Sequence, residues 1–142
     1  MTISAKLAAD LLAAAIHWSG LPSMPVDQLP FFEPMSATEI TITQCPYVLT
    51  ECEGIVSLYD HENYLIVYLD TLDMNSVEDR SFIMHEMVHV LQHHAHLVPT
   101  PLTCIDVERI EKQAYRAQNA YLRSEGSYLH VGLSDKSTKC QG

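Results

Sequence analysis

Apolar residues recur at helical spacing in the first twenty residues of the chain. The segment 1–19 places them on one helical face at Ile3, Leu7, Leu11, Ala14 and Trp18, and Gly20 follows. Three to four residues between apolar positions is the period of an amphipathic helix. Because Asp10 interrupts the apolar run, we expect this helix to be part of the fold and not a signal peptide.

Two longer helices are predicted in the second half of the chain. The first runs from about 76 to 97: Ser76 offers a capping hydroxyl, and Pro99 stops the helix. The second runs from about 105 to 124, with Gly126 just beyond as a C-terminal signal. Both helices carry polar and titratable side chains, which makes them the first place to look for chemistry.

Short segments with the pattern of β-strands lie between these helices. Prolines at 22, 25, 30 and 34 predict an extended connector, which Phe31 and Phe32 attach to the core. Alternating or β-branched runs then predict strands at 39–43, 47–50, 55–59 and 64–70, and residues 60–63 form a hairpin loop between the last two. The order of elements predicts one α+β domain over 1–142, with its core at about 36–126 and a helix plus connector at 1–35.

Composition narrows the classes of partner. Of the 142 residues 47% are hydrophobic and 18% are charged, which is typical of a globular protein. The net charge of −10 makes nucleic acid and anionic membrane poor partners, and no run approaches the roughly 20 apolar residues of a membrane span. The basic residues Arg109, Lys112, Arg116 and Arg123 are interpreted as a solvated face of the last helix.

The four cysteines leave the compartment open. They are Cys45, Cys52, Cys104 and Cys140, and no pair has the spacing of a zinc knuckle. Two disulfides, in the simplest set Cys45–Cys52 and Cys104–Cys140, would indicate a periplasmic or secreted protein. Four reduced thiols would indicate a cytoplasmic one.

Residues 85–89 read His-Glu-Met-Val-His and are the strongest functional signal. On a helix, His85 and His89 lie one turn apart on one face and can both bind one zinc ion. Glu86 is placed to reach a water on the metal, so it can serve as general base and then general acid. Apolar neighbours such as Ile83 and Leu91 predict that this helix is partly buried.

A catalytic zinc site needs a third protein ligand. The following helix offers Glu108 and Glu111, one turn apart, and either can face the metal. His93 lies a further turn along the first helix, too far along the axis to complete a tetrahedron, and is interpreted as part of a solvated histidine-rich end. Gln92 and Gln118 are expected to form hydrogen bonds between the helices.

A zinc-binding helix followed by a helix that supplies glutamate resembles the gluzincin metallopeptidases, and the small size resembles the minigluzincins. The gluzincin pattern Glu-x-x-Ala-Asp is matched by Glu111-Lys112-Gln113-Ala114-Tyr115, with Tyr115 in place of the acidic residue. The resemblance covers about residues 54–125 and implies a zincin-like fold with one Zn²⁺ on His85, His89 and Glu111. The missing acid leaves the hydrogen-bond partner of a zinc-binding histidine unassigned.

The resemblance also implies an edge strand that binds an extended peptide, and residues 64–70 occupy that position. The alternative is an ordinary strand covered by the proline-rich segment, which would make the cleft self-inhibited. A donor to the oxyanion of the transition state is also needed, and Tyr115, Tyr128 and His130 are the candidates.

The sequence therefore predicts a zinc-dependent hydrolase, most simply a peptidase acting on peptide or protein substrates. The alternative is a catalytically silent or self-inhibited zinc-binding module with a structural or partner-binding role. A helical interaction domain without metal is a third hypothesis. Substrate specificity and oligomeric state do not follow from the sequence.

Overall fold

The computed structural model describes residues 2–44 and 54–132. Its elements, in chain order, are α1 (Ala5–Ser19), the 3-10 turn η1 (Val26–Gln28), β1 (Phe31–Met35), α2 (Ala37–Gln44), β2 (Ser57–Asp60), β3 (Leu65–Leu69), α3 (Val77–His94) and α4 (Cys104–Ser124). Helices and a small mixed sheet together confirm the α+β class.

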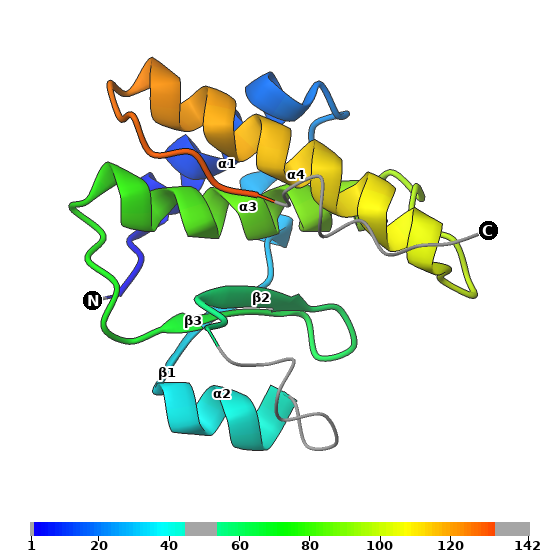
Figure 1. The fold of residues 1–142 in the computed structure, drawn as a ribbon, viewed down its shortest axis with the longest axis horizontal. Coiled ribbons are helices and arrows are strands. Elements are labelled where there is room, and N and C mark those ends of the chain that lie inside the picture. The colour runs from blue at the N-terminus through cyan, green and yellow to red at the C-terminus, as the bar shows by residue number, and fades with distance from the viewer. Residues whose placement is uncertain (1, 45–53, 133–142) are drawn as a thin grey trace.

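Helix α3 lies at the centre of the molecule. It packs against α1 and α4 on one side and against β2 and β3 on the other (Figure 1). One hydrophobic cluster joins these elements, with Leu11 of α1, Ile66 of β3, Met87 of α3 and Ala114 of α4 all buried. Helix α2 lies on the far side of the sheet from this helical layer. The centre of the fold is therefore also the helix that carries the histidines.

The sheet has the order β1-β3-β2, with β3 parallel to β1 and antiparallel to β2. The predicted hairpin is confirmed. The expectation that residues 64–70 form an edge strand is wrong, because β3 is paired on both sides. The alternative, a strand covered by the proline-rich segment, is what the structure shows. The proline-rich segment supplies β1, which covers one side of β3, and β2 is the edge strand nearest α3.

Two further expectations fail in the first half of the chain. Residues 39–43 belong to α2 and not to a strand, because Ser36 and Glu39 form reciprocal capping bonds, each 3.1 Å long, that begin a helix. The capping outweighs the weak strand preference of the β-branched residues that follow. Phe32 packs on the core as expected, whereas Phe31 is 77% exposed. The predicted strand 47–50 lies outside the described residues.

The long helices match their predicted positions. Ser76 caps α3 through the backbone N–H of Asp79, and Thr103 with Asp106 forms a capping box at α4. Helix α3 ends at His94, a few residues before the predicted end, and His96 then takes a left-handed conformation with φ of 58°. Among the described residues, no helix is long and apolar enough to cross a membrane.

Candidate metal centre and active site

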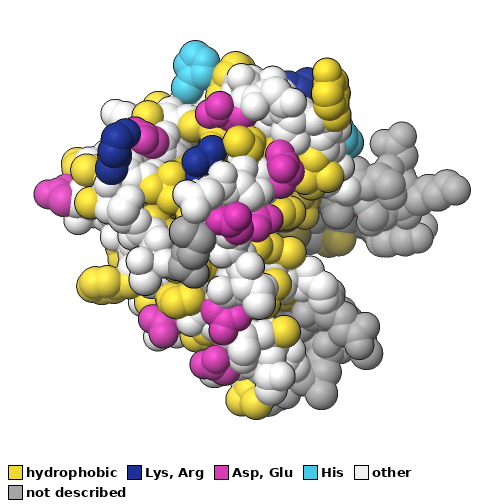
Figure 2. Space-filling view, turned by 90° about the vertical axis from the view of Figure 1, so that its left-hand side faces the viewer, with side chains coloured by type: hydrophobic (Ala, Val, Ile, Leu, Met, Phe, Trp, Pro, Cys, Tyr) yellow, Lys and Arg dark blue, Asp and Glu magenta, His cyan; other side chains and the backbone are white. Residues whose placement is uncertain are grey.

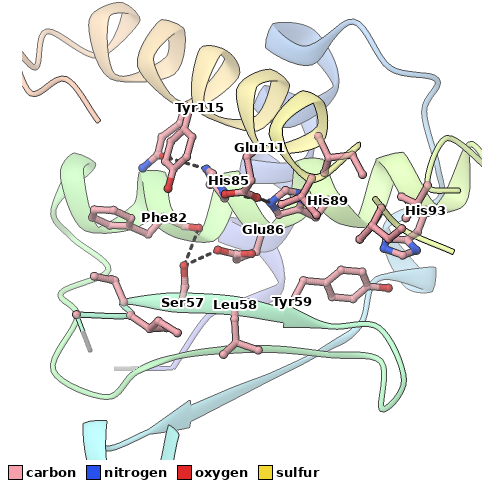
Figure 3. Close-up of a pocket in the computed structure, with 18 residues that line it drawn as sticks. Ser57, Leu58, Tyr59, Phe82, His85, Glu86, His89, His93, Glu111 and Tyr115 are labelled. Atoms are coloured by element: carbon pink, nitrogen blue, oxygen red, sulfur yellow. Dashed lines mark hydrogen bonds and ion pairs between the residues drawn. The ribbon is translucent and has the colours of Figure 1, made fainter. Parts of the chain in front are cut away.

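The candidate centre begins with two histidines on α3. His85 and His89 are one turn apart, and their Nε2 atoms are separated by 3.2 Å. His85 is buried and His89 is nearly so. Both rings point from α3 toward α4 (Figure 3), so a ligand of both must lie between these two helices.

Helix α4 places Glu111 opposite the two imidazoles. Its carboxylate Oε1 contacts Nε2 of His89, and its Oε2 lies 3.6 Å from Nε2 of His85. Figure 3 shows this carboxylate between the two rings. One ligand atom from each of the three residues lies within 4.8 Å of the others. Glu108, the other candidate, lines a separate cavity.

Two glutamines hold the rings in this orientation. Oε1 of Gln118 lies 2.9 Å from Nδ1 of His85, and Oε1 of Gln92 lies 2.8 Å from Nδ1 of His89. Because an amide oxygen only accepts hydrogen bonds, each Nδ1 carries the proton and each Nε2 is left to bind a metal. Gln118 thus supplies an acceptor for Nδ1 of His85, a partner left unassigned because Tyr115 stands in place of an acidic residue.

The glutamines are themselves fixed by their amide nitrogens. Nε2 of Gln118 donates to Oγ of Ser81 at 2.9 Å. Nε2 of Gln92 donates to the carbonyl oxygen of Ile110 at 3.0 Å and to Oε1 of Gln113 at 2.9 Å. The expected hydrogen bonds between helices are confirmed. The sequence did not predict that the two glutamines also orient the histidines. The absence of an acidic residue at position 115 indicated only that some acceptor was needed.

Glu86 lies on the sheet side of the same helix. It is 6% exposed, and its Oε2 accepts a hydrogen bond of 2.8 Å from Oγ of Ser57 in β2. The carboxylate points down toward β2, below His85 and His89 (Figure 3). Ser57 was not among the residues singled out from the sequence, because nothing in its local pattern distinguishes it from other strand serines.

The pKa values in the cluster reflect strong coupling between the imidazoles and the carboxylate. Burial alone would lower the pKa of His89, but its hydrogen bond to Glu111 and the charges of Glu86 and Glu111 raise it to about 9. Burial alone would raise the pKa of Glu111, but the hydrogen bonds to His85 and His89 hold it well below its usual range. Both shifts have the same cause, the short contact between a positively charged imidazole and the Glu111 carboxylate.

A cavity of about 520 Å³ opens onto this cluster. Strand β2 forms one wall of the cavity through Ser57 and Tyr59. The apolar residues that line the cavity include Phe82, Val98, Leu102, Val107 and Ile110. His85, Glu86, His89 and Glu111 all line it as well. This volume lies within the range that holds small molecules or a few residues of a peptide.

The donor set fits zinc. Two imidazole nitrogens and one carboxylate oxygen, with an open position, are a known catalytic combination. Ligands at about 2.0–2.1 Å in a tetrahedral site lie about 3.3 Å apart, close to the 3.2 Å between Nε2 of His85 and Nε2 of His89. The pre-set tautomers add to the fit, since metal-binding histidines donate their other N–H to an acceptor.

A family model described as a domain of unknown function, DUF6647, matches residues 6–135. The chain belongs to the DUF6647 family. No curated protein and no solved structure is significantly similar to the chain. The stretch matched by DUF6647 includes all of the residues that form the candidate centre, from Ser57 to Gln118.

The proposed transition-state donors lie in different places. The Tyr115 ring packs against His85, with centroids 4.5 Å apart, and lines the cavity. Burial, together with the charges of Glu111 and Glu86, raises the pKa of Tyr115, so its hydroxyl stays a donor. His130 lines a second cavity, and Tyr128 is fully exposed. Tyr115 is therefore the one of the three that reaches the candidate site.

His93 lies beside the centre but outside the three-residue ligand group. Its ring stacks on His61 of the β2–β3 loop, with centroids 3.9 Å apart, at one end of the cavity. Burial and the nearby His61 and His89 lower the pKa of His93 to about 4. Instead of a solvated helix end, this histidine forms part of the cavity wall.

The cysteine prediction stays open. Cys104 is the first residue of α4, and Cys45, Cys52 and Cys140 lie outside the described residues. The pairing of the cysteines, and the compartment that it would indicate, therefore stay predictions.

Proposed function

We propose that this chain is a zinc-dependent hydrolase, most simply a peptidase, with His85, His89 and Glu111 as the metal ligands and Glu86 as the proton acceptor. The proposal rests on one observation. Three side chains that together suit zinc, and the buried carboxylate of Glu86, all line the same cavity. A zincin-like fold is part of the same proposal, and the crossing of α3 and α4 beside a small mixed sheet supports it.

Zinc bound at this site would polarise a carbonyl group and lower the pKa of a coordinated water to about 7. The role of Glu86 is to accept a proton from the attacking water and to pass it to the leaving amine. The hydrogen bond from Ser57 occupies Oε2 of Glu86, so we assign Oε1 as the atom that accepts the proton from the water. Tyr115, held against His85, is the residue we assign to donate to the oxyanion.

The position of β2 supports a peptide as substrate. Strand β2 pairs with β3 on one side, and within the described residues its other edge carries no strand partner. The same strand lines the cavity next to Glu86. An extended peptide can add to such an edge through backbone hydrogen bonds, while the apolar lining receives a side chain. β1, from the proline-rich segment, pairs with β3 at the opposite side of the sheet and does not pair with β2.

The proposal is tested by metal content and cleavage together. Protein purified without chelators should contain one zinc per chain, and it should cleave some members of a mixed peptide library analysed by mass spectrometry. Glu86→Gln should keep the zinc and lose cleavage, because the amide cannot accept the proton. Glu125→Gln, on an exposed residue just after α4, is the matched control and should behave as the parent.

Three outcomes discriminate between the hypotheses. Absence of zinc after purification, and no uptake on titration, would rule out both zinc hypotheses. Zinc without cleavage of any peptide would favour the silent zinc-binding module. A Glu86→Gln protein that binds zinc and cleaves as fast as the parent would exclude Glu86 as the proton acceptor.

A further inference from the structure

A second and larger cavity lies along the other side of α4. Its volume is about 880 Å³, and it is bounded by the end of α1, the start of the α3–α4 connection and the segment 130–132. The lining residues that matter here are Trp18, Leu97, Ile105, Arg109, Lys112 and Arg116. Two of its lining residues also take part in the candidate metal centre: Tyr115 borders both cavities, and Gln113 accepts a hydrogen bond from Gln92.

The wall formed by α4 is positively charged in a strongly acidic chain. The chain has 8 lysines and arginines against 18 aspartates and glutamates, and three of those eight cations line this cavity. Among the described residues of the lining, Glu108 is the one carboxylate, and Arg109 makes a 3.5 Å contact with Asp106 just outside the cavity. On the face drawn in Figure 2, by contrast, acidic side chains are spread over both the helical layer and the sheet. The α4 wall of this cavity therefore carries a net positive charge, although the protein as a whole is negatively charged.

Apolar side chains are exposed in the same cavity. Trp18 is 38% exposed, Leu97 is 43% exposed and Ile105 is 56% exposed, and all three line it. An exposed tryptophan beside two aliphatic side chains leaves apolar area in water, and burial of that area by a ligand is favourable. Cations beside exposed apolar groups suit a ligand that combines carboxylates with hydrophobic side chains.

The C-terminal wall of the cavity is anchored to α4. Asn119 donates from Nδ2 to the carbonyl oxygen of Val131 at 2.7 Å and accepts from its N–H at 2.9 Å. Gly132 lies so close to Tyr115 that a Cβ there would be 3.1 Å from the ring. These contacts hold the segment against the helix and form one wall of the cavity.

The spacing of the cations selects the type of anion. Arg109, Lys112 and Arg116 lie on successive turns, and the first and last are about 10 Å apart along the helix axis. Alternate side chains of an extended peptide are about 7 Å apart, so separate carboxylates of one peptide match this spacing. A long polynucleotide would extend over the acidic remainder of the surface, which the net charge of −10 opposes.

We infer that this second cavity binds an acidic peptide segment, with its carboxylates on Arg109, Lys112 and Arg116 and an apolar side chain against Trp18. This inference does not depend on zinc or on catalysis. Trp18 is the one tryptophan of the chain, so its fluorescence reports directly on occupation of the cavity.

The test is a fluorescence titration of the full chain with an acetylated hexapeptide that alternates acidic residues and leucine. The matched control peptide replaces each acid by its amide. We expect saturable quenching or a shift of the Trp18 emission with the acidic peptide, and binding that weakens as salt is raised to about 0.5 M. The double variant Arg109→Glu/Arg116→Glu should bind about tenfold more weakly or worse. Arg123→Glu, on the same helix but outside the cavity, should bind within about twofold of the parent.

Several results would overturn the inference. They are equal binding of the acidic and amide peptides, equal loss of binding in Arg123→Glu, and tighter binding of a ten-residue oligothymidylate than of the acidic peptide. Sedimentation of the free protein provides a further check. A dimer that dissociates in the Arg109→Glu/Arg116→Glu variant would assign this face to a second copy of the chain instead.

Discussion

Nδ1 of His85 donates a hydrogen bond to Oε1 of Gln118, 2.9 Å away, across the interface between α3 and α4. Gln118 is fully buried, and its amide nitrogen is held by Ser81. The orientation of a proposed zinc ligand therefore depends on a residue 33 positions later in the chain.

Replacement of Gln118 by leucine should lower zinc affinity by about 10- to 100-fold, because His85 loses the acceptor that sets its tautomer. Gln118→Glu keeps an acceptor oxygen at the same place and should retain most of the affinity. Competition with a chelating dye measures the zinc dissociation constant of each variant. Equal affinities in the leucine and parent proteins would show that Gln118 does not orient the ligand.

Glu111→Ala should abolish stoichiometric zinc binding at micromolar concentrations, because two imidazoles alone do not form a complete site. Glu108→Ala removes a carboxylate one turn earlier on α4, at the second cavity, and is the matched control. It should bind zinc as the parent does, measured by elemental analysis after dialysis. Retention of zinc in Glu111→Ala together with its loss in Glu108→Ala would reverse the assignment of the third ligand.

Ser57→Ala should lower peptide cleavage by about 10- to 100-fold while zinc content stays at one per chain. The reason is the loss of a hydrogen bond of 2.8 Å to the Glu86 carboxylate, a class of bond worth about 1.5–3 kcal/mol. Ser57→Thr keeps the hydroxyl and should restore much of the rate. If the alanine and parent rates are equal, the proposed role of this strand in positioning Glu86 is wrong.

The metal-free protein should lose stability as the pH rises from about 6 to 9. The pKa of His89 is raised to about 9 in the folded state, so its stabilising contribution is complete below its unfolded pKa and is lost as the pH rises through about 9. The pKa of Glu111 is lowered, so its contribution is present above its unfolded pKa and is lost at lower pH. The His89–Glu111 pair therefore stabilises the fold most between the unfolded-state pKa values of Glu111 and His89, at about pH 4.5–6.5.

Zinc should reverse this dependence, because the metal binds neutral imidazole and competes with the proton. The melting temperature of the chelator-treated protein should fall toward pH 9, while the increase on adding zinc grows over the same range. Thermal melts at several pH values, with Glu111→Gln as the control for the pair, provide the measurement. Identical pH profiles in the parent and Glu111→Gln would show that the pair contributes nothing.

Local patterns were enough to predict the three long helices and the β2–β3 hairpin. Ser76 and Gly20 mark the ends of helices through a hydrogen bond or a dihedral angle that involves only nearby residues. The same local approach was wrong at 39–43, where β-branched residues favoured a strand and one capping box at Ser36 decided for a helix. It was also wrong about which strand lies at the edge, because the order of strands depends on long-range pairing.

The sequence by itself determined the pair His85 and His89 and the adjacent Glu86, because the period of one helix places two imidazoles on one face. The tertiary structure decided everything that crosses between elements. It placed Glu111 rather than Glu108 against the two imidazoles, supplied Gln118 and Gln92 as acceptors for their Nδ1 protons, and placed Ser57 of β2 on the Glu86 carboxylate. The physical reason is that spacing along one helix is set by its own geometry, whereas distances between elements are set by the packing of a shared core.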